Sequence, residues 1–146
     1  MDRLHTDSLA ALPADVLRRP FDRRALQPGI VHLGIGAFAR AHTLPITDAA
    51  IAATGDTRWG VVGVSLRQPD TRDALAPQDG LYALALRDEG GARLQVVGSL
   101  LKLLVAPEDP QAVLQALAAP TTRVVTLTIT EKGYHAGPDG AADYLA

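Results

Sequence analysis

The residues best suited to chemistry in this sequence form a short glycine turn. Gly34 and Gly36 follow an apolar run and are one residue apart, and Ala39 comes three residues later. This is the G-x-G-x-x-(G/A) spacing of turns that bind a dinucleotide pyrophosphate. The first glycine permits a tight turn, the second leaves room for phosphates, and the small third residue lets a helix approach the strand. We therefore expect a dinucleotide site whose donors are the N–H groups of both glycines.

The side chains around this turn give further candidates. Ile35, Ala37 and Phe38 belong to the predicted loop, where the shape of the backbone matters more than the side chains, and Phe38 is equally compatible with a core position. Arg40 and His42 come next, and either could orient the loop or reach a cofactor phosphate. A histidine close to a helix start is more typical of a structural role, so Arg40 is the stronger candidate.

A second group of candidates lies beyond the next predicted strand. Arg67 and Asp70 follow the run 60–66. At this place an acidic residue would bind the ribose 2′-hydroxyl of NAD, whereas an arginine would suit the 2′-phosphate of NADP. The two signals conflict, and they come about 30 residues after the glycines, later than the usual ~20. Solvent-exposed charges are an equally good interpretation of both residues.

Two charged residues follow the last predicted strand. Glu131 and Lys132 lie at its carboxyl end, the edge where open α/β sheets bind ligands. Glu131 could line the nicotinamide pocket, although a surface Glu–Lys pair is an equally good interpretation. Lys132 has no recognisable acid–base partner, so we do not assign it as a catalytic base. The histidines lack metal-ligand spacing, which predicts no metal site, and His32 is interpreted as a core residue.

The glycine turn requires a strand before it and a helix after it. The run Ile30–Leu33 is the predicted strand. Pro45 fits the first turn of a helix that Thr43 caps and that continues to about Ala53. This places an irregular segment at 37–42, so we expect loop amides, more than a helix dipole, to hold the pyrophosphate. The apolar run 60–66 then completes a βαβ unit.

The remaining chain adds other elements to this unit. We expect one helical turn at Asp70–Leu75, an antiparallel hairpin over 81–100, and a helix that begins at Asp109-Pro110 and ends before Pro120. The β-branched run Val124–Thr130 predicts a central strand. The fold class is therefore α/β, a Rossmann-type parallel sheet of three recognisable strands with an inserted antiparallel hairpin, apparently truncated. Residues 1–29 form an N-terminal arm, and 30–146 a partial dinucleotide-binding domain.

Composition limits the possible classes of protein. The chain has 146 residues, a formal net charge of −2 and no cysteine. A nearly neutral chain favours neither nucleic acid nor an anionic membrane as a partner, and the lack of cysteine excludes disulfides and thiolate chemistry. No apolar run is long enough for a membrane span or signal peptide. We therefore expect a cytoplasmic protein.

Several blocks of sequence, taken in order, resemble the mannitol dehydrogenase family of polyol and hexuronate dehydrogenases, which includes fructuronate reductases. The likeness extends from about Phe21 to Tyr134, and the Thr-Glu-Lys-Gly-Tyr block is its most specific part. Two positions depart from the family: Pro45 falls where relatives continue a helix, and Ala39 stands where they often have histidine. The blocks are Phe21-Asp-Arg, 29–38, Arg40-Ala-His42, 59–67, Asp79-Gly-Leu-Tyr82 and 128–134.

The resemblance implies an N-terminal Rossmann-type domain that binds NAD or, less often, NADP. It also implies a helical C-terminal domain, beyond this chain, that binds a polyol or sugar acid. The lysine base, asparagines and histidine of the family come from segments after this chain stops, so no catalytic residue is assigned here. Two alternatives stay open: a nucleotide-binding module without catalysis, which describes the chain as given, and, much less favoured, a methyltransferase domain using S-adenosylmethionine.

Overall fold

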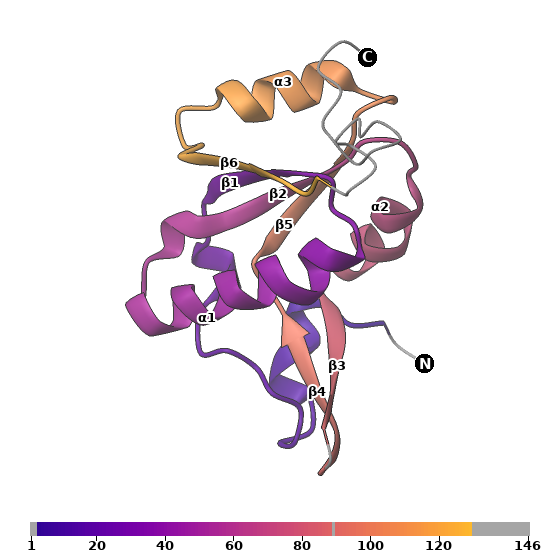
Figure 1. Cartoon of the computed structure of the whole chain (residues 1–146). Helices are drawn as coiled ribbons and strands as arrows, with labels where there is room; N and C mark the ends of the chain where they lie inside the picture. The colour runs from indigo at the N-terminus through magenta and orange to yellow at the C-terminus, as the bar shows by residue number, and fades with distance from the viewer. Residues whose placement is uncertain (1–2, 89, 130–146) are drawn as a thin grey trace, which may run out of the picture.

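A computed structural model describes residues 3–88 and 90–129 of the chain. At its centre is a four-stranded parallel sheet in the order β5-β2-β1-β6 (Figure 1). This order corresponds to the 3-2-1-4 part of a Rossmann sheet, and it confirms the predicted fold class. The strands are β1 (Pro28–Leu33), β2 (Gly60–Ser65), β5 (Leu100–Val105) and β6 (Val124–Leu127).

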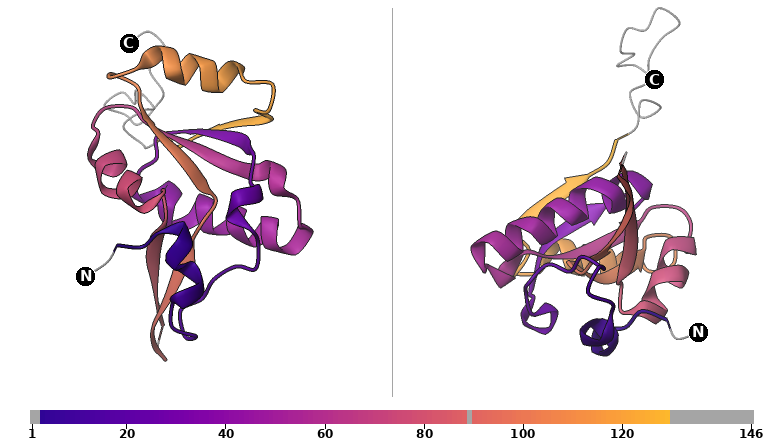
Figure 2. Two further views of the ribbon diagram at one scale, coloured as in Figure 1. Left: turned by 180° about the vertical axis from the view of Figure 1, so that it is seen from behind. Right: turned by 90° about the horizontal axis from the view of Figure 1, so that it is seen from below.

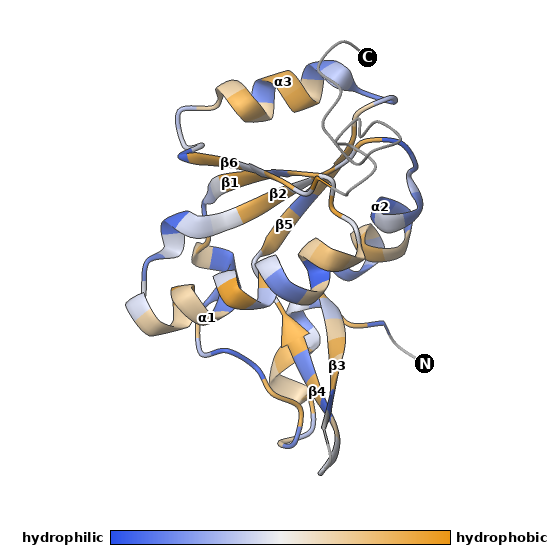
Figure 3. Cartoon of the chain, in the orientation of Figure 1, coloured by the Kyte–Doolittle hydropathy of each residue, from blue (hydrophilic) through white to orange (hydrophobic). Residues whose placement is uncertain are grey.

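Helices cover both faces of this sheet. α1 (Leu44–Thr54) and α3 (Pro110–Ala118) lie on opposite sides of it, as two views show (Figures 1 and 2). Every residue of β2 is buried, as expected for a parallel strand covered on both faces. Apolar residues are concentrated in the strands between the helices (Figure 3). One apolar cluster centres on Ile35, Leu44 and Leu100, and the other on Val31, Val64 and Val113.

The inserted hairpin is confirmed, with one difference. β3 (Tyr82–Asp88) and β4 (Gly91–Val97) form an antiparallel pair. The predicted second arm continued to Leu100, but that residue begins β5 of the parallel sheet. The prediction of three parallel strands was therefore wrong, because the structure describes four. Lys102 interrupts the apolar pattern of β5, and it is tolerated because its side chain is exposed.

The short helices agree with the sequence more closely. α2 (Asp70–Leu75) is the expected helical turn. α3 begins after Asp109, whose carboxylate accepts the Ala112 N–H at 2.8 Å, so this cap is confirmed. β6 differs, because it was predicted as a central strand and it forms an edge of the described sheet. Short 3₁₀ helices occupy Thr6–Ala11, Arg23–Ala25, Thr57–Trp59 and Ala76–Gln78.

The start of the long helix differs from the prediction. Helical backbone begins at Ala37, directly after the glycine turn, and passes through a π-helical turn at Ala39–Thr43 before α1. The Thr43 side chain makes no capping bond, so the predicted cap is wrong. The wider turn precedes Pro45, a residue without an N–H to donate, and the chain stays helical through it. Gly55, with φ 69°, ends α1 in the left-handed conformation typical of a glycine at a helix end.

A buried carboxylate ties the hairpin to α1. The side chain of Asp48 is 1% exposed, and it accepts the N–H groups of Gly98 and Ser99, each at 2.8 Å. Burial raises the pKa of Asp48, and hydrogen bonds from Ser99 and Gly98 oppose this shift. Asp48 therefore fixes the turn that connects the hairpin to the parallel sheet.

Candidate functional site

The structure has an open groove of about 440 Å³ at the carboxyl ends of β1 and β2. This is where the strand order of an open α/β sheet places a ligand, beside the point at which the chain crosses to the other half of the sheet. Three segments far apart in sequence form its walls: the glycine turn, the segment after β2 and the end of β6. The lining residues are Gly34, Ile35, Gly36, Ala37, Phe38, Ser65, Leu66, Arg67, Gln68, Thr71 and Thr128.

The glycine turn uses its own N–H groups to hold its shape. Gly34 has φ +91°, a conformation that requires glycine. The N–H groups of Gly34 and Ile35 both donate to the Val64 carbonyl, at 2.9 and 3.1 Å. The Gly36 N–H donates to the Gly34 carbonyl at 2.7 Å. The prediction that the two glycines supply the free donors of the site was therefore wrong.

The free donors come instead from the start of the helix. Arg40 makes the first helical bond, from its N–H to the Gly36 carbonyl at 3.1 Å. The N–H groups of Ala37, Phe38 and Ala39 precede it and have no acceptor one turn back in the helix. Together with the helix dipole they make this end attractive to anions. We expected loop amides, more than a helix dipole, to hold the pyrophosphate. The structure corrects this, because the helix begins directly after the glycine turn.

Gly36 leaves space beside these donors. A Cβ built on Gly36 would have only the Gly34 carbonyl oxygen within 4 Å, at 3.9 Å. The position that a side chain would fill is open, and Gly36 lines the groove. The absence of a side chain is therefore not required by packing, which fits a cradle for a phosphate group.

Only some of the other candidate residues line the groove. Phe38 is 61% exposed and lies against the His42 ring, with centroids 4.8 Å apart, so the core interpretation of Phe38 is wrong. Arg67 lines the groove as expected. The Arg40 and Asp70 side chains do not line it, although Arg40 donates to Thr71, which does. Glu131 lies outside the described residues.

Several residues of the groove were not singled out from the sequence. Ser65 is the last, buried residue of β2, and Leu66 and Gln68 follow it. The end of that apolar run was the signal that could have found them. Thr71 lies in the first turn of α2, and Thr128 opens the block that resembles a family motif, but only their positions in the fold bring them to the groove.

A second hollow of about 390 Å³ adjoins the groove and shares Phe38 and Thr128 with it. His32 lies at this hollow and is 2% exposed, which confirms its assignment to the interior. Its two ring nitrogens hydrogen-bond the hydroxyls of Thr126 and Thr128, at 2.8 and 3.1 Å. Burial lowers the pKa of His32, so the ring is held neutral and oriented between β1 and β6.

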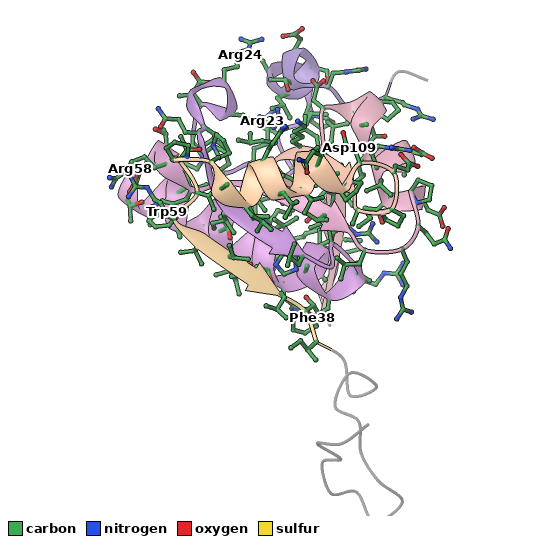
Figure 4. The ribbon with its side chains drawn as sticks, turned by 90° about the horizontal axis from the view of Figure 1, so that it is seen from above. Arg23, Arg24, Phe38, Arg58, Trp59 and Asp109 are labelled. Carbon is green, nitrogen blue, oxygen red and sulfur yellow. The ribbon has the colours of Figure 1, made fainter. Side chains whose placement is uncertain are left out.

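The opposite end of the sheet is closed. Trp59 directly precedes β2, its Nε1 donates to Asp56 at 2.8 Å, and Arg123 lies 6.0 Å from the centre of its ring. Viewed from above, Phe38 and Trp59 lie far apart along the strands (Figure 4). Within the part of the chain that the structure describes, no helix is long and apolar enough to cross a membrane, and no three His, Asp or Glu side chains are grouped as metal ligands would be.

The parallel strand order and the glycine turn leading into a helix define a Rossmann-type domain. A sequence model described as the mannitol dehydrogenase Rossmann domain matches residues 28–146. The chain therefore belongs to the mannitol dehydrogenase family. Its relatives include the mannitol 2-dehydrogenases of Pyricularia oryzae, 40% identical over 139 residues, and of Cereibacter sphaeroides, 39% identical over 130 residues. These alignments cover 91% and 88% of this chain, but only 28% and 27% of the relatives.

Solved structures give the same result. A Pseudomonas fluorescens mannitol 2-dehydrogenase, in ternary complex with NAD and D-mannitol, matches with a TM-score of 0.87 and 35% identity over 99% of this chain. A D-sorbitol dehydrogenase in substrate-free form matches with a TM-score of 0.81 and 36% identity over 96% of the chain. In both cases the chain spans 30% of the longer structure. The resemblance deduced from the sequence blocks is thereby confirmed.

Proposed function

We propose that this chain is the NAD(P)-binding part of a polyol dehydrogenase and that the cofactor occupies the groove at the carboxyl ends of β1 and β2. The observation that carries the proposal is the open space at Gly36, next to the first turn of the helix. A pyrophosphate fits there because Ala37 and Phe38, whose N–H groups have no acceptor in the helix, line the groove and are exposed, whereas Ala39 is fully buried. The NAD found in the Pseudomonas fluorescens structure supports this choice of cofactor.

The residues of this chain bind and orient the cofactor. A bound nicotinamide supplies the chemistry, namely acceptance or donation of a hydride. The glycine turn fixes the position of the helix start relative to β1, and the segment with Arg67 forms the other wall of the groove. Glu131 stays a proposed cofactor contact, and Asp70 is a weaker one because it does not line the groove. Residues 30–146 are the proposed nucleotide-binding unit, with 1–29 as an arm.

The substrate class follows from the relatives. The matched proteins are mannitol 2-dehydrogenases and a sorbitol dehydrogenase, which favours a sugar alcohol over a sugar acid such as mannonate. The reaction would interconvert a secondary alcohol and its ketone. The test is an assay of a longer protein that contains this sequence, with NAD and mannitol or with NADH and fructose or fructuronate. Change in NADH absorbance with mannitol or fructose is expected, whereas activity with fructuronate alone would overturn the choice of polyol.

The binding site itself can be tested in the 146-residue chain. NADH fluorescence should rise and saturate as the chain is added, with no turnover of the cofactor. Fluorescence of Trp59 is a poorer reporter, because this residue is at the far end of the sheet from the groove. If cofactor fluorescence shows no saturable change up to millimolar concentration, the proposed function is wrong.

A further inference from the structure

A carbonyl in the helix after the glycine turn lacks the donor that the helix would normally supply. In the π-helical turn the Leu44 N–H donates to the Ala39 carbonyl, five residues back. The next bond of this pattern would join the N–H of residue 45 to the Arg40 carbonyl, but residue 45 is a proline and has no N–H. The Arg40 carbonyl therefore needs a donor from outside the helix.

The inserted hairpin supplies this donor. Tyr82 is the first residue of β3, and its hydroxyl donates to the Arg40 carbonyl at 2.6 Å. Both residues are half-buried, and an unpaired carbonyl is costly where water is excluded. Burial raises the pKa of Tyr82, so the hydroxyl keeps its proton and remains a donor. A side chain from a distant part of the sequence thus takes the place of the backbone N–H that Pro45 lacks.

Arg40 connects two walls of the groove. Its N–H donates to the Gly36 carbonyl at 3.1 Å, and its Nη1 donates to the Thr71 hydroxyl at 3.1 Å. Gly36 and Thr71 both line the groove, the first on the glycine turn and the second on α2. Tyr82 does not line the groove, but it fixes the backbone of the residue that holds these two segments together.

We propose that Tyr82 is a positioning residue of the cofactor site, which replaces the hydrogen bond that Pro45 cannot make and so holds the helical turn 37–40 in place for the cofactor. The proposal rests on the function proposed above, because its effect is on the same groove. Tyr82 acts through Arg40 and does not touch the cofactor. The inserted hairpin is therefore part of the support of the site, in addition to its link to α1 through Asp48.

A double-mutant cycle in the 146-residue chain tests this role, with NADH affinity measured by cofactor fluorescence and stability by urea denaturation. Tyr82→Phe removes the hydroxyl and keeps the ring, so the apolar packing of this residue is retained. We expect it to lower the urea midpoint and to weaken NADH binding about fivefold, which corresponds to the loss of one hydrogen bond. Pro45→Ala restores a backbone N–H next to the Arg40 carbonyl. The double variant should therefore recover most of both losses.

Pro110→Ala is the matched control for the rescue. Both prolines lie in the first turn of a helix, and both changes give the unfolded chain the same additional freedom. In α3, however, an N–H at this position has no helical carbonyl to bond. Combined with Tyr82→Phe, Pro110→Ala should restore neither the NADH affinity nor the urea midpoint.

Three results would overturn the positioning role of Tyr82. Unchanged NADH affinity in Tyr82→Phe would do so and leave the proposed function intact. A loss that Pro45→Ala does not recover, or that Pro110→Ala recovers equally, would also do so, because the hydroxyl would then not replace the N–H of residue 45. Failure of the native chain to bind NADH would overturn the proposed function as well. If Tyr82→Phe does not fold, the double variant with Pro45→Ala decides, since it is expected to fold and to bind NADH.

Discussion

Glycines near the two ends of β1 lie in opposite surroundings, because one is tightly packed and the other borders open space. At the amino end, a Cβ on Gly29 would lie 1.8 Å from the Arg58 carbonyl oxygen, a position that the backbone already fills. At the carboxyl end, a Cβ on Gly36 would have its nearest neighbour at 3.9 Å. Hydrogen bonds between Gly60 and Gln27, and between Gln27 and Thr57, close the amino end further. Packing therefore requires a glycine at position 29. At position 36 packing does not, because a side chain there would meet open space.

This difference separates structural from functional positions without knowledge of any relative. Where packing requires a glycine, replacing it lowers the stability of the fold. A glycine that borders empty space shows its role only when a ligand is present. The contrast agrees with the general placement of ligands at the carboxyl ends of strands in open α/β sheets.

Replacement of Gly29 by alanine should have the largest effect. The added methyl group meets the Arg58 backbone, which cannot turn away as a flexible side chain could. We expect the free energy of unfolding to fall by about 3 kcal/mol, the upper part of the range for overpacked sites. Urea denaturation measures the change. A fully stable Gly29→Ala protein would show that the amino end of β1 is looser than described.

Asp48→Asn should destabilise the fold without affecting the groove. The carboxylate accepts two backbone N–H groups, but an amide can present oxygen to only one of them. The other buried N–H would then face a second donor, which costs about 2 kcal/mol. Chemical denaturation gives the stability, and Asp15→Asn at an exposed position is the control. Cofactor affinity should stay the same in both variants.

The same residue predicts a pH dependence. Burial raises the pKa of Asp48, so the native state holds this proton more tightly than the unfolded state does. The stability gained in this way is complete at low pH and is lost as pH rises through the folded-state pKa. The difference in unfolding free energy between the native chain and Asp48→Asn should therefore widen as pH is lowered from neutrality. A difference that narrows would contradict the assigned cause.

Gly36→Ala should leave the stability of the fold unchanged and weaken cofactor binding. Because the new methyl group has open space around it, the melting temperature should match that of the native chain. The methyl group occupies the space assigned to the pyrophosphate, so NADH affinity should fall at least tenfold, or about 1.4 kcal/mol. Gly98→Ala is the matched control, since its Cβ would meet Phe21 at an ordinary 3.5 Å outside the groove. Equal NADH affinities for the two variants would show that Gly36 has no special role in cofactor binding.

The smallest effect is expected at the cap of α3. Asp109→Ala removes the acceptor of the Ala112 N–H, which costs about 1 kcal/mol for a typical cap. The melting temperature should fall by a few degrees, and NADH affinity should not change, because α3 does not line the groove. Asp109→Asn retains an acceptor and should recover most of the loss. A change in affinity would mean that α3 supports the groove.

The sequence predicted those parts of the fold in which a single physical requirement dominates. β2 could be recognised because both of its faces are buried, which requires an apolar or small residue at every position. β5 was not recognised, because its exposed Lys102 interrupts that pattern. The helix start was misplaced because Pro45 is typical of a first helical turn. A π-helical turn accommodates it here, and residue pattern does not reveal such a turn.

The sequence predicted where the candidate site lies, but not which backbone N–H groups are available at it. The glycine spacing located the turn, and Arg67 was placed correctly at the far wall. The choice of donors failed, because the glycine N–H groups bond to Val64 and to Gly34 itself, and this depends on how β1 and β2 lie side by side. Thr71 and Thr128 reach the groove only through the tertiary fold. Spacing in a sequence locates a turn, whereas strand pairing decides which of its N–H groups stay free.

Backbone NMR can distinguish cofactor binding beyond the carboxyl end of β1 from binding at its amino end. A titration of the isotope-labelled chain with NADH should shift the amide signals of Ala37, Phe38 and Arg67. The amide signals of Gly29 and Trp59, at the closed end, should stay in place. Shifts confined to the closed end, or spread evenly over the sheet, would contradict the account.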